Sequence, residues 1–436
     1  MADVRPRGLF ISYNGLLEPL GSSQIVPYLR GLARAYRMSV LSFEKGSQRS
    51  VEDAEATARL DRSLAEAGIE WIQLRYHKRP SLPATLYDIL HGLRRAARLH
   101  ARQPIDLVHA RGYVPAAIAW GLKRASRVPY LFDIRGLQAE ESVDAGHWSP
   151  RSLRYRLTKW MEQRLLRDAD GLVTLAAAIR PHMEQLPGLR GRATIPPWEV
   201  IPSCADLEHF RFRPDGRRRV RAALGVGERP LWIYAGSIGT WYLLEEMLDC
   251  FRVARSEWAG LGLLLVINAP VEPVRAAVRR AGLSQEDVFV RRARFEEMPD
   301  YLSAAEAGIA FIRPCVSKRS SSPTKFAEYL ACGLPLLINW GIGDGDDLIA
   351  AQGAGALVRS FEAAEYRRAA VALRELVARG REPFRQIAEQ HFSVVSRALP
   401  AYRRLYQRIL GGASALDAFP TPGAVNHQRV NEPVTI

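Results

Sequence analysis

Residues 320–335 read SSSPTKFAEYLACGLP, a short amphipathic segment with a marked start and a marked end. Ser322 before Pro323 predicts the beginning of a helix, because a hydroxyl can cap the free amides and proline suits the first turn. Gly333 predicts the end of this helix, and the apolar residues 334–338 predict a buried strand. The segment therefore predicts a helix that packs on the sheet of an α/β domain.

The start of this predicted helix has the chemistry of an anion site. The free amides of Thr324 and Lys325 and the helix dipole attract negative charge, and Lys325 adds a full positive charge. The hydroxyls of Ser321 and Ser322 can donate hydrogen bonds. One turn on, about 5 Å away, Glu328 can accept from two neighbouring hydroxyls, as a ribose presents. The spacing suits a nucleoside diphosphate, and it suits an ordinary capped helix with a solvated Lys–Glu pair equally well.

Short apolar runs alternate with segments of helical spacing along the rest of the chain, which is typical of parallel sheets covered on both faces. Predicted strands of the first half are 9–13, 38–43, 69–74, 106–109, 129–132 and 172–175. After a pause around 196–202 and 211–219, predicted strands follow at 231–235, 263–267, 288–290, 308–312 and 334–338. Two such series separated by a pause predict two Rossmann-like domains with a boundary near residue 206.

Composition restricts the class of protein. A chain of 436 residues suits two α/β domains and a tail, and its 61 Lys+Arg against 46 Asp+Glu give a net charge of +15. That excess indicates an anionic partner, such as a nucleotide, a nucleic acid or an anionic membrane surface. No apolar run reaches a membrane span, no signal peptide is recognisable, and the dispersed cysteines indicate neither zinc nor disulfides. We therefore expect a cytoplasmic protein.

The 320–335 segment resembles the donor-binding signature of the retaining family 4 (group 1) glycosyltransferases, in the form with S-P-x-K before the ribose-binding glutamate. The resemblance implies that Glu328 binds the ribose hydroxyls and that Ser322, Thr324 and Lys325 meet the diphosphate. The common form of the signature has a further glutamate where this chain has Ser320.

Two further segments resemble the same family in the same order, EEMPDYLSAAEAGIAFI at 296–312 and VIPSCADLEHF at 200–210. The resemblance implies a GT-B fold, an α/β architecture with two Rossmann-like β/α/β domains facing across a cleft. Residues 1–205 would form the acceptor-binding domain and 206–395 the nucleotide-sugar-binding domain. A C-terminal helix at 396–411 would pack back on the first domain. Residues 412–436 lack periodicity and are expected to be disordered.

A glycine-rich turn follows the first strand of the second predicted domain, in YAGSIGTWYLLEEM at 234–247. The backbone amides of Gly236, Ser237 and Gly239 can approach a phosphate closely, although a plain β–α turn explains the glycines as well. Relatives of this type carry an Arg and a Lys in the loop, where this chain has Ser237 and residues 240–242. Lys325 or another arginine would then neutralise the diphosphate.

The N-terminal domain has two candidate acceptor segments at the carboxyl ends of predicted strands. Residues 15–24, with Gly21 and Ser22, are predicted to form a long loop that bends across the cleft and binds acceptor; a flexible connection is the alternative. In the second, LFDIRGLQAEESVDAGHW at 131–148, the resemblance places Asp133 near the sugar and acceptor. We hypothesise that Arg135 binds an acidic group, and an Arg135–Glu141 ion pair is the alternative.

Two basic amphipathic segments, 82–102 and 151–167, are candidates for contact with a membrane. Their apolar sets are Leu86, Leu90, Leu93 and Ala97 in the first and Leu153, Leu157, Trp160, Met161 and Leu165 in the second, with arginines around both. We expect peripheral binding to anionic lipid at the inner face of the membrane. The alternative is that the apolar sides pack on the sheet and the arginines are solvated. Nucleic acid is not expected as a partner, since no recognition motif is present.

These observations predict a glycosyltransferase that moves a sugar from a UDP- or GDP-sugar to a hydroxyl of a saccharide or lipid-linked acceptor in polysaccharide synthesis. Retention, no metal and no cofactor besides the nucleotide-sugar are expected, with Asp133, Lys325 and Glu328 as catalytic residues. The alternatives are another GT-B enzyme, such as a sugar-nucleotide epimerase or a phosphorylase, or an inactive GT-B scaffold. A dinucleotide dehydrogenase is disfavoured, because no GxGxxG follows the first strand.

Overall fold

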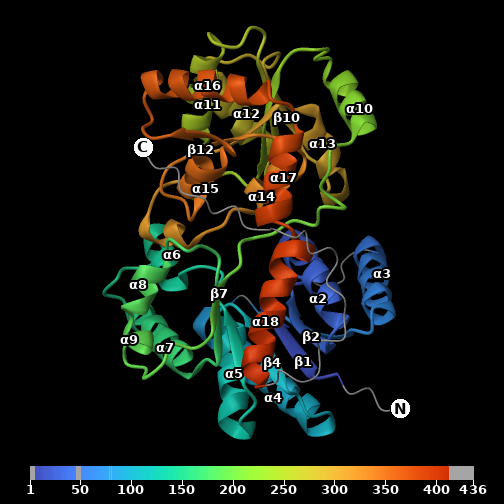
Figure 1. The fold of residues 1–436 in the computed structure, drawn as a ribbon, viewed down its shortest axis with the longest axis vertical. Helices are drawn as coiled ribbons and strands as arrows, with labels where there is room; N and C mark the ends of the chain where they lie inside the picture. The colour runs from blue at the N-terminus through green and yellow to red at the C-terminus, as the bar shows by residue number, and fades with distance from the viewer. Residues whose placement is uncertain (1–4, 46–50, 78, 80, 412–436) are drawn as a thin grey trace, which may run out of the picture.

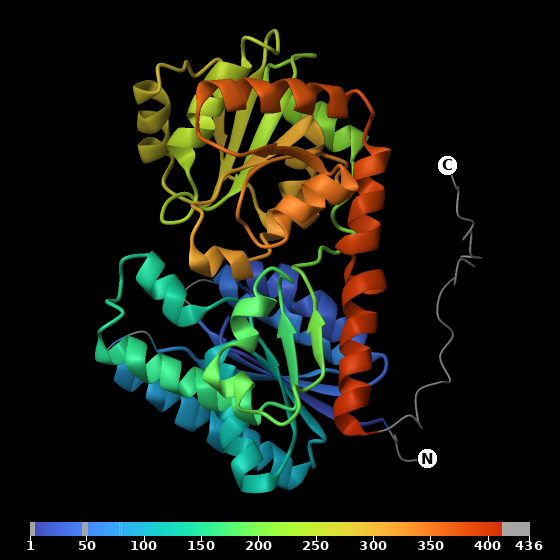
Figure 2. The ribbon, with the colours of Figure 1, turned by 60° about the vertical axis from the view of Figure 1, so that its left-hand side comes forward.

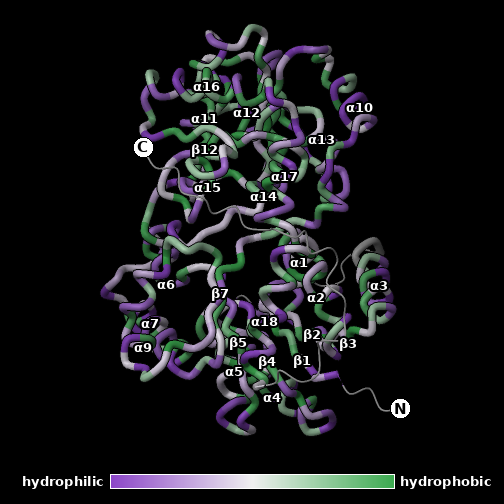
Figure 3. The backbone as a smooth tube through the Cα atoms, viewed as in Figure 1, coloured by the Kyte–Doolittle hydropathy of each residue, from purple (hydrophilic) through white to green (hydrophobic). Residues whose placement is uncertain are grey.

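The computed structural model describes residues 5–45, 51–77, 79 and 81–411. Figure 1 shows two domains stacked along the long axis, each built around a sheet with helices on its faces. Hydrophobic backbone, green in Figure 3, runs through the middle of both domains, and hydrophilic segments lie towards the outside. The tail predicted at 412–436 lies outside the described residues.

The N-terminal sheet has seven parallel strands in the order β3-β2-β1-β4-β5-β6-β7. The strands are β1 (Arg7–Ser12), β2 (Arg37–Glu44), β3 (Glu70–Arg75), β4 (Leu107–Arg111), β5 (Tyr130–Asp133), β6 (Gly171–Thr174) and β7 (Trp198–Val200). The helices are α1 (Pro19–Gln24), α2 (Val26–Ala33), α3 (Val51–Glu66), α4 (Ser81–Arg102), α5 (Tyr113–Ser126), α6 (Gln138–Asp144), α7 (Leu153–Asp168), α8 (Arg180–Glu184) and α9 (Pro187–Arg190).

The C-terminal sheet has six parallel strands in the order β10-β9-β8-β11-β12-β13. The strands are β8 (Leu231–Gly236), β9 (Gly262–Ile267), β10 (Val288–Arg291), β11 (Ala307–Ala310), β12 (Leu336–Asn339) and β13 (Gly355–Val358). The helical elements are α10 (Pro214–Leu224), α11 (Leu244–Ala254), α12 (Val271–Arg280), η1 (Phe295–Glu297), α13 (Met298–Ala304), η2 (Val316–Ser320), α14 (Thr324–Ala331), α15 (Gly345–Gln352), α16 (Ala363–Val377) and α17 (Glu382–His391).

The predicted strands are confirmed, and the α/β class with them. Two edge strands were missed. β7 has three residues, one of them Glu199, and it directly follows two prolines, so it has no apolar run. β13 has the short sequence GALV, in which only Val358 is β-branched, so it lacks the composition typical of a strand.

After α17 the chain crosses back to the N-terminal domain. Ala205 and Ser393 form a bridge where the two crossings lie side by side. A π-helical turn, η3 (Val394–Ala398), and helix α18 (Leu399–Leu410) follow, and α18 packs against α2, β4 and β7. Figure 2 shows α17 and α18 as one red column along both domains.

Two local predictions are corrected by the structure. Helix α14 begins at Thr324, with Pro323 as its N-cap and no side-chain cap. The Ser322 hydroxyl, predicted to cap this helix, instead accepts a hydrogen bond from the Ser203 amide of the interdomain linker. The long loop predicted at 15–24 contains helix α1, which proline allows to begin at Pro19. The predicted end of α14 is confirmed, because Gly333 adopts a φ of 74°.

Both sheets reverse their strand order at the same kind of place, between β1 and β4 and between β8 and β11. Loops diverge there to opposite faces of a sheet and leave a crevice at the carboxyl ends of the strands. The two crevices face each other across the domain boundary, where the main cavity lies.

Candidate active site

A cavity of about 650 Å³ lies between the domains and is lined from both sides. The N-terminal wall comes from the segments after β1, β4 and β5, and the C-terminal wall from the segments after β8 and β11. All five segments leave the carboxyl ends of their strands. The topology of the two sheets thus explains where the cavity forms.

The start of α14 forms the C-terminal wall. Ser321, Ser322 and Thr324, predicted from the sequence to bind the donor, line the cavity. Lys325 points away from the opening: its side chain is buried, and Nζ lies 3.8 Å from the ring centroid of Tyr242. Gly236 lies close beside it, and a Cβ there would come within 3.2 Å of Lys325 Nζ.

Glu328 lies one turn further along α14 and is partly buried. Its carboxylate makes no hydrogen bond or ion pair with any residue in the described part of the chain, so the solvated Lys325–Glu328 pair is not observed. Desolvation raises the pKa of Glu328 to about 7, and the nearby Lys325 charge opposes this shift only partly. A carboxylate with a raised pKa and no partner is a candidate group for binding a ligand. Glu328 and Lys325 lie behind the residues of this segment that line the cavity.

The loop after β8 carries aromatic side chains in the place where cations were expected. The Lys318 ammonium lies 4.0 Å from the Trp241 ring centroid, and the Arg313 guanidinium lies 5.3 Å from it. Lys325 makes the same kind of cation–π contact with the Tyr242 ring, and its charge lowers the pKa of the Tyr242 hydroxyl. The positive charge absent from the loop is therefore supplied by the segment between β11 and α14, and Lys318 lines the cavity.

Other predicted donor residues lie behind this wall. Gly236 and Gly239 adopt positive φ values of 142° and 97°, which turn the chain towards the cavity. Ser237 accepts a hydrogen bond from Tyr234 through its carbonyl oxygen and does not line the cavity. Ser320 is also buried, and its hydroxyl donates to the Ser317 carbonyl at 2.6 Å, so it is not directed at a ligand.

Asp133 lies at the centre of a buried polar network in the N-terminal wall and is fully buried. Its Oδ2 lies 3.3 Å from Arg111 Nη1 and accepts from the Tyr402 hydroxyl at 3.1 Å, and its Oδ1 lies 3.4 Å from Arg135 Nη1. His109 contacts the same carboxylate at 3.3 Å. Asp133 does not line the cavity, whereas both arginines do.

The charges in this network are unequal. Burial alone would raise the pKa of Asp133, but Arg135, the His109 hydrogen bond and Arg111 hold it well below its usual range. Burial lowers the pKa of His109, which keeps the imidazole neutral. One carboxylate therefore faces two guanidinium groups, and a net positive charge remains at this wall.

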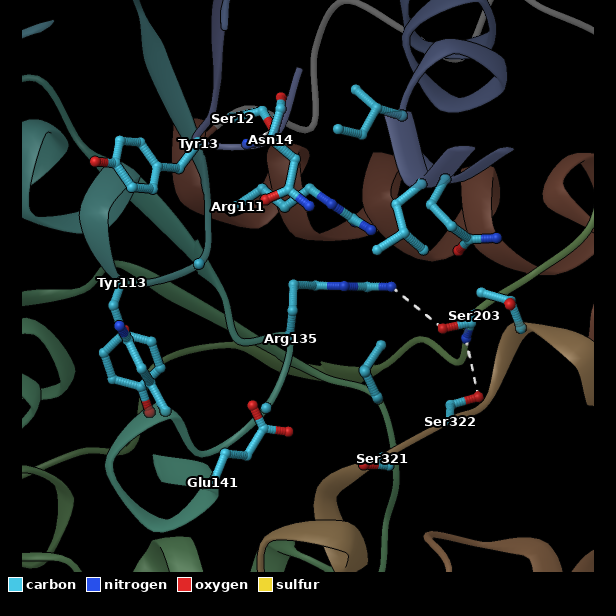
Figure 4. A pocket seen from close by; sticks show the side chains of 18 of the residues that line it. Ser12, Tyr13, Asn14, Arg111, Tyr113, Arg135, Glu141, Ser203, Ser321 and Ser322 are labelled. Carbon is cyan, nitrogen blue, oxygen red and sulfur yellow. Dashed lines mark hydrogen bonds between the residues drawn. The ribbon is translucent and has the colours of Figure 1, made fainter. Parts of the chain in front are cut away.

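Contacts across the domain boundary hold the two walls together. Lys318 Nζ pairs with Glu141 Oε1 at 2.9 Å, and the Ser317 amide donates to Asp144 at 3.0 Å. Because Glu141 pairs with Lys318, the alternative Arg135–Glu141 ion pair is wrong. Arg135 extends instead towards the linker, where Nη2 donates to Ser203 Oγ at 3.4 Å (Figure 4).

The predicted acceptor residues Gly21 and Ser22 do not reach the cavity. Gly21 packs inside α1, where a Cβ would lie 2.2 Å from the Gly15 carbonyl oxygen, and the Ser22 hydroxyl donates to the Leu16 carbonyl. Both predictions took the segment for an open loop. Gln24 of the same helix lines the cavity and was missed.

The two basic segments form helices whose leucines are exposed towards the amino end and pack against the core towards the carboxyl end. On α4 the buried residues are Ala84, Asp88, Gly92 and Ala96, while Leu86 is 58% exposed. On α7 Leu153 is 77% exposed. The alternative that the apolar sides pack on the sheet is therefore wrong for the first turns of both helices, because small side chains make the contacts of α4.

None of the described helices is both long and apolar enough to cross a membrane. Within the same residues, no group of three or more His, Cys, Asp or Glu side chains is arranged to hold a metal ion.

Comparison with known proteins agrees with this geometry. Residues 23–198 match the family model described as a glycosyl transferase 4-like domain. A GDP-mannose-dependent alpha-(1-6)-phosphatidylinositol monomannoside mannosyltransferase of Mycolicibacterium smegmatis is 23% identical over 145 residues, which are 32% of this chain and 37% of that protein.

Two solved structures share the whole fold. Sucrose-phosphate synthase from Thermosynechococcus elongatus superposes with a TM-score of 0.67 at 16% identity, covering 92% of this chain and 99% of that one. Anabaena HepE in complex with UDP and glucose gives a TM-score of 0.66 at 18% identity, covering 92% and 100%. The chain therefore has the GT-B fold, and its residues 23–198 match the glycosyl transferase 4-like family.

Proposed function

We propose that the protein transfers a sugar from a nucleotide-sugar to a hydroxyl acceptor, with retention and without metal. The observation that carries the proposal is the arrangement on α14, where free amides and hydroxyls line the cavity and an unpartnered Glu328 follows one turn later. A UDP complex of HepE and the GDP-mannose dependence of the mycobacterial relative support a nucleotide-sugar donor.

The donor would lie along the C-terminal wall. Its diphosphate would meet the α14 amides with Ser321, Ser322 and Thr324, and the turn from Gly236 through Ser237 to Gly239 would cover it. Lys325 would neutralise it from within the wall. Glu328 would accept from the ribose hydroxyls, which restores the hydrogen bonds that its burial removes.

The chemistry proposed for this wall is electrostatic. Negative charge would develop on the leaving diphosphate, and the fixed ammonium of Lys325, the ammonium of Lys318 and the α14 dipole would stabilise it. The acceptor would attack on the face that the nucleotide leaves, so no covalent nucleophile is assigned. We propose that Asp133 acts through Arg111 and Arg135 as a positioning residue.

The donor site is tested by calorimetry with UDP, GDP and ADP. Lys325→Ala and Glu328→Ala are each expected to weaken binding of the preferred nucleotide by about 1–3 kcal/mol, the range for a lost charged hydrogen bond. Glu375→Ala, an exposed glutamate of α16, is the matched control and should leave affinity unchanged. Equal affinity in all three variants would refute the site.

We further propose that the protein binds anionic membranes peripherally through α4 and α7, presenting the cavity to a lipid-linked acceptor. Both helices flank α5 on one side of the N-terminal domain (Figure 2), and Thr85 of α4 lines the cavity. The exposed apolar side chains in their first turns are Leu82, Leu86, Tyr87, Leu90, Leu153, Leu157 and Trp160. Apolar side chains ringed by arginines are typical of interfacial helices.

Co-sedimentation with phosphatidylglycerol vesicles tests the membrane proposal. The double variant Leu153→Ser with Leu157→Ser is expected to reduce binding severalfold, as is reversal of Arg94, Arg98 and Arg102 to Glu. Val395→Ser removes an equally exposed apolar group, 64% exposed, at the domain junction and should bind like the wild type. Unchanged sedimentation of the leucine and arginine variants would refute the proposal for these helices.

A further inference from the structure

The N-terminal wall contains an anion site that the donor does not occupy. We propose that Arg111 and Arg135 bind a phosphate ester carried by the acceptor. The proposal rests on the proposed glycosyl transfer, because it assigns the chemistry of the second substrate in that reaction.

The two arginines are fixed by the sheet. Arg111 ends β4, next to Asp133 at the end of β5, and Arg135 follows two residues later. Their side chains are only 11% and 17% exposed, and the carboxylate that holds them is fully buried. Figure 4 shows both guanidinium groups pointing the same way into the cavity.

Most of the donor capacity of this pair is unused. Each guanidinium carries five N–H donors in a planar fork, which suits the oxygens of a phosphate. Within the described residues Arg111 donates only to Asp133, and Arg135 donates only to Asp133 and Ser203. The free donors face the cavity that both residues line.

Two further groups converge on the same place. Helix α5 begins at Tyr113, directly after Arg111 and Gly112, and its first-turn amides have no side-chain cap. The positive end of this helix therefore lies beside the arginines. Gln24 also lines the cavity, is 2% exposed, and its Oε1 is buried with no partner among the described residues. The phosphate of a ligand would accept from the first-turn amides of α5, and a neighbouring hydroxyl would donate to Gln24 Oε1.

The site faces the proposed donor site across the same cavity, with Ser203 of the linker between Arg135 and Ser322. Asp133 and the α18 tyrosine Tyr402 anchor the arginines within the N-terminal domain, whereas the proposed diphosphate groups belong to α14 on the other wall. A nucleotide diphosphate held on α14 leaves the Arg111–Arg135 pair for a different anion. The shared ligand chemistry is a phosphate ester, from either a soluble phosphosugar or a phospholipid headgroup.

The test is calorimetry on the full chain saturated with the nucleotide that the wild type binds. Glucose 1-phosphate is the soluble probe, and dihexanoyl phosphatidylglycerol is the headgroup probe. Arg111→Gln should lower affinity for the bound probe at least tenfold and leave nucleotide affinity within twofold. Arg111→Lys should fall between, because it keeps the charge and loses the fork, and Arg379→Gln, at an exposed position just after α16, should match the wild type.

Each outcome has a defined meaning. Binding of only one probe supports the proposal and identifies the source of the phosphate. If neither probe binds, or Arg111→Gln binds them like the wild type, the proposal is wrong. An equal loss of nucleotide and probe affinity would place the pair in the donor site and also overturn it. Failure of the proposed function is seen separately, as unchanged nucleotide affinity in Glu328→Ala.

Discussion

An acidic group lies behind each wall of the cavity, and the two differ in their partners: Asp133 is fully buried and Glu328 is partly buried. Asp133 has four partners in the protein, and its pKa lies well below the usual range. Glu328 has none among the described residues, and desolvation raises its pKa to about 7. A carboxylate satisfied by the protein organises structure, whereas one left unsatisfied is available to a ligand. The comparison separates a positioning role from a binding role.

The largest expected effect is a difference in the free energy of unfolding between variants of Asp133 and of Glu328. Asp133→Asn should lower the free energy of unfolding by about 3–5 kcal/mol, because it leaves two buried guanidinium groups without a counter-charge. Glu328→Gln should leave stability at pH 8 equal or higher, since it removes a desolvated carboxylate. Chemical denaturation of both variants measures this. Similar losses in the two would contradict the assignment of opposite roles.

The next effect concerns pH. The pKa of Glu328 is raised in the folded protein, so its carboxylate ionises only as pH passes about 7. If ribose hydroxyls bind the ionised form, nucleotide affinity should rise roughly tenfold between pH 6 and pH 8, one pKa unit either side of the midpoint. Glu328→Gln should lose this part of the dependence, and the nucleotide's own titration cancels in the comparison. An identical profile in both proteins would contradict the binding role.

The smallest effect tests the long-range partner of Asp133. Tyr402→Phe removes the hydroxyl that donates to Asp133 and leaves the ring in place. We expect a loss of about 1 kcal/mol in stability, typical of one hydrogen bond, with nucleotide affinity unchanged. A loss of nucleotide affinity with normal stability would show that the two walls are coupled more tightly than the contacts indicate.

Most of the strands and the end of α14 were predicted correctly. These features depend on residues close together in the sequence, namely the apolar runs that form buried strands and the glycine at position 333. Ser321, Ser322 and Thr324 were identified for the same reason. The motif-based resemblance was drawn mainly from the C-terminal half, whereas the family model matches residues 23–198, in the other half.

Contacts between distant segments could not be predicted in this way. Tyr402 meets Asp133 across 269 residues, and Lys318 meets Glu141 across 177. The helical turn around Gly21 depends on packing against the Leu16 backbone, which a glycine-rich segment does not signal. Arg111 could have been predicted, since it comes two residues after the predicted strand at 106–109.

The return of the chain through α18 has a consequence for synthesis. Leu399, Tyr402 and Tyr406 belong to the core of the N-terminal domain, although they are among the last described residues to be made. Domains usually fold as they leave the ribosome, amino end first. Here the first domain leaves the ribosome before α18 has been made, so its core is incomplete until the second domain has been translated. During that time His109 and Asp133 lack their α18 partners, Tyr406 and Tyr402. The nascent chain would have to keep that apolar groove from aggregating throughout the interval.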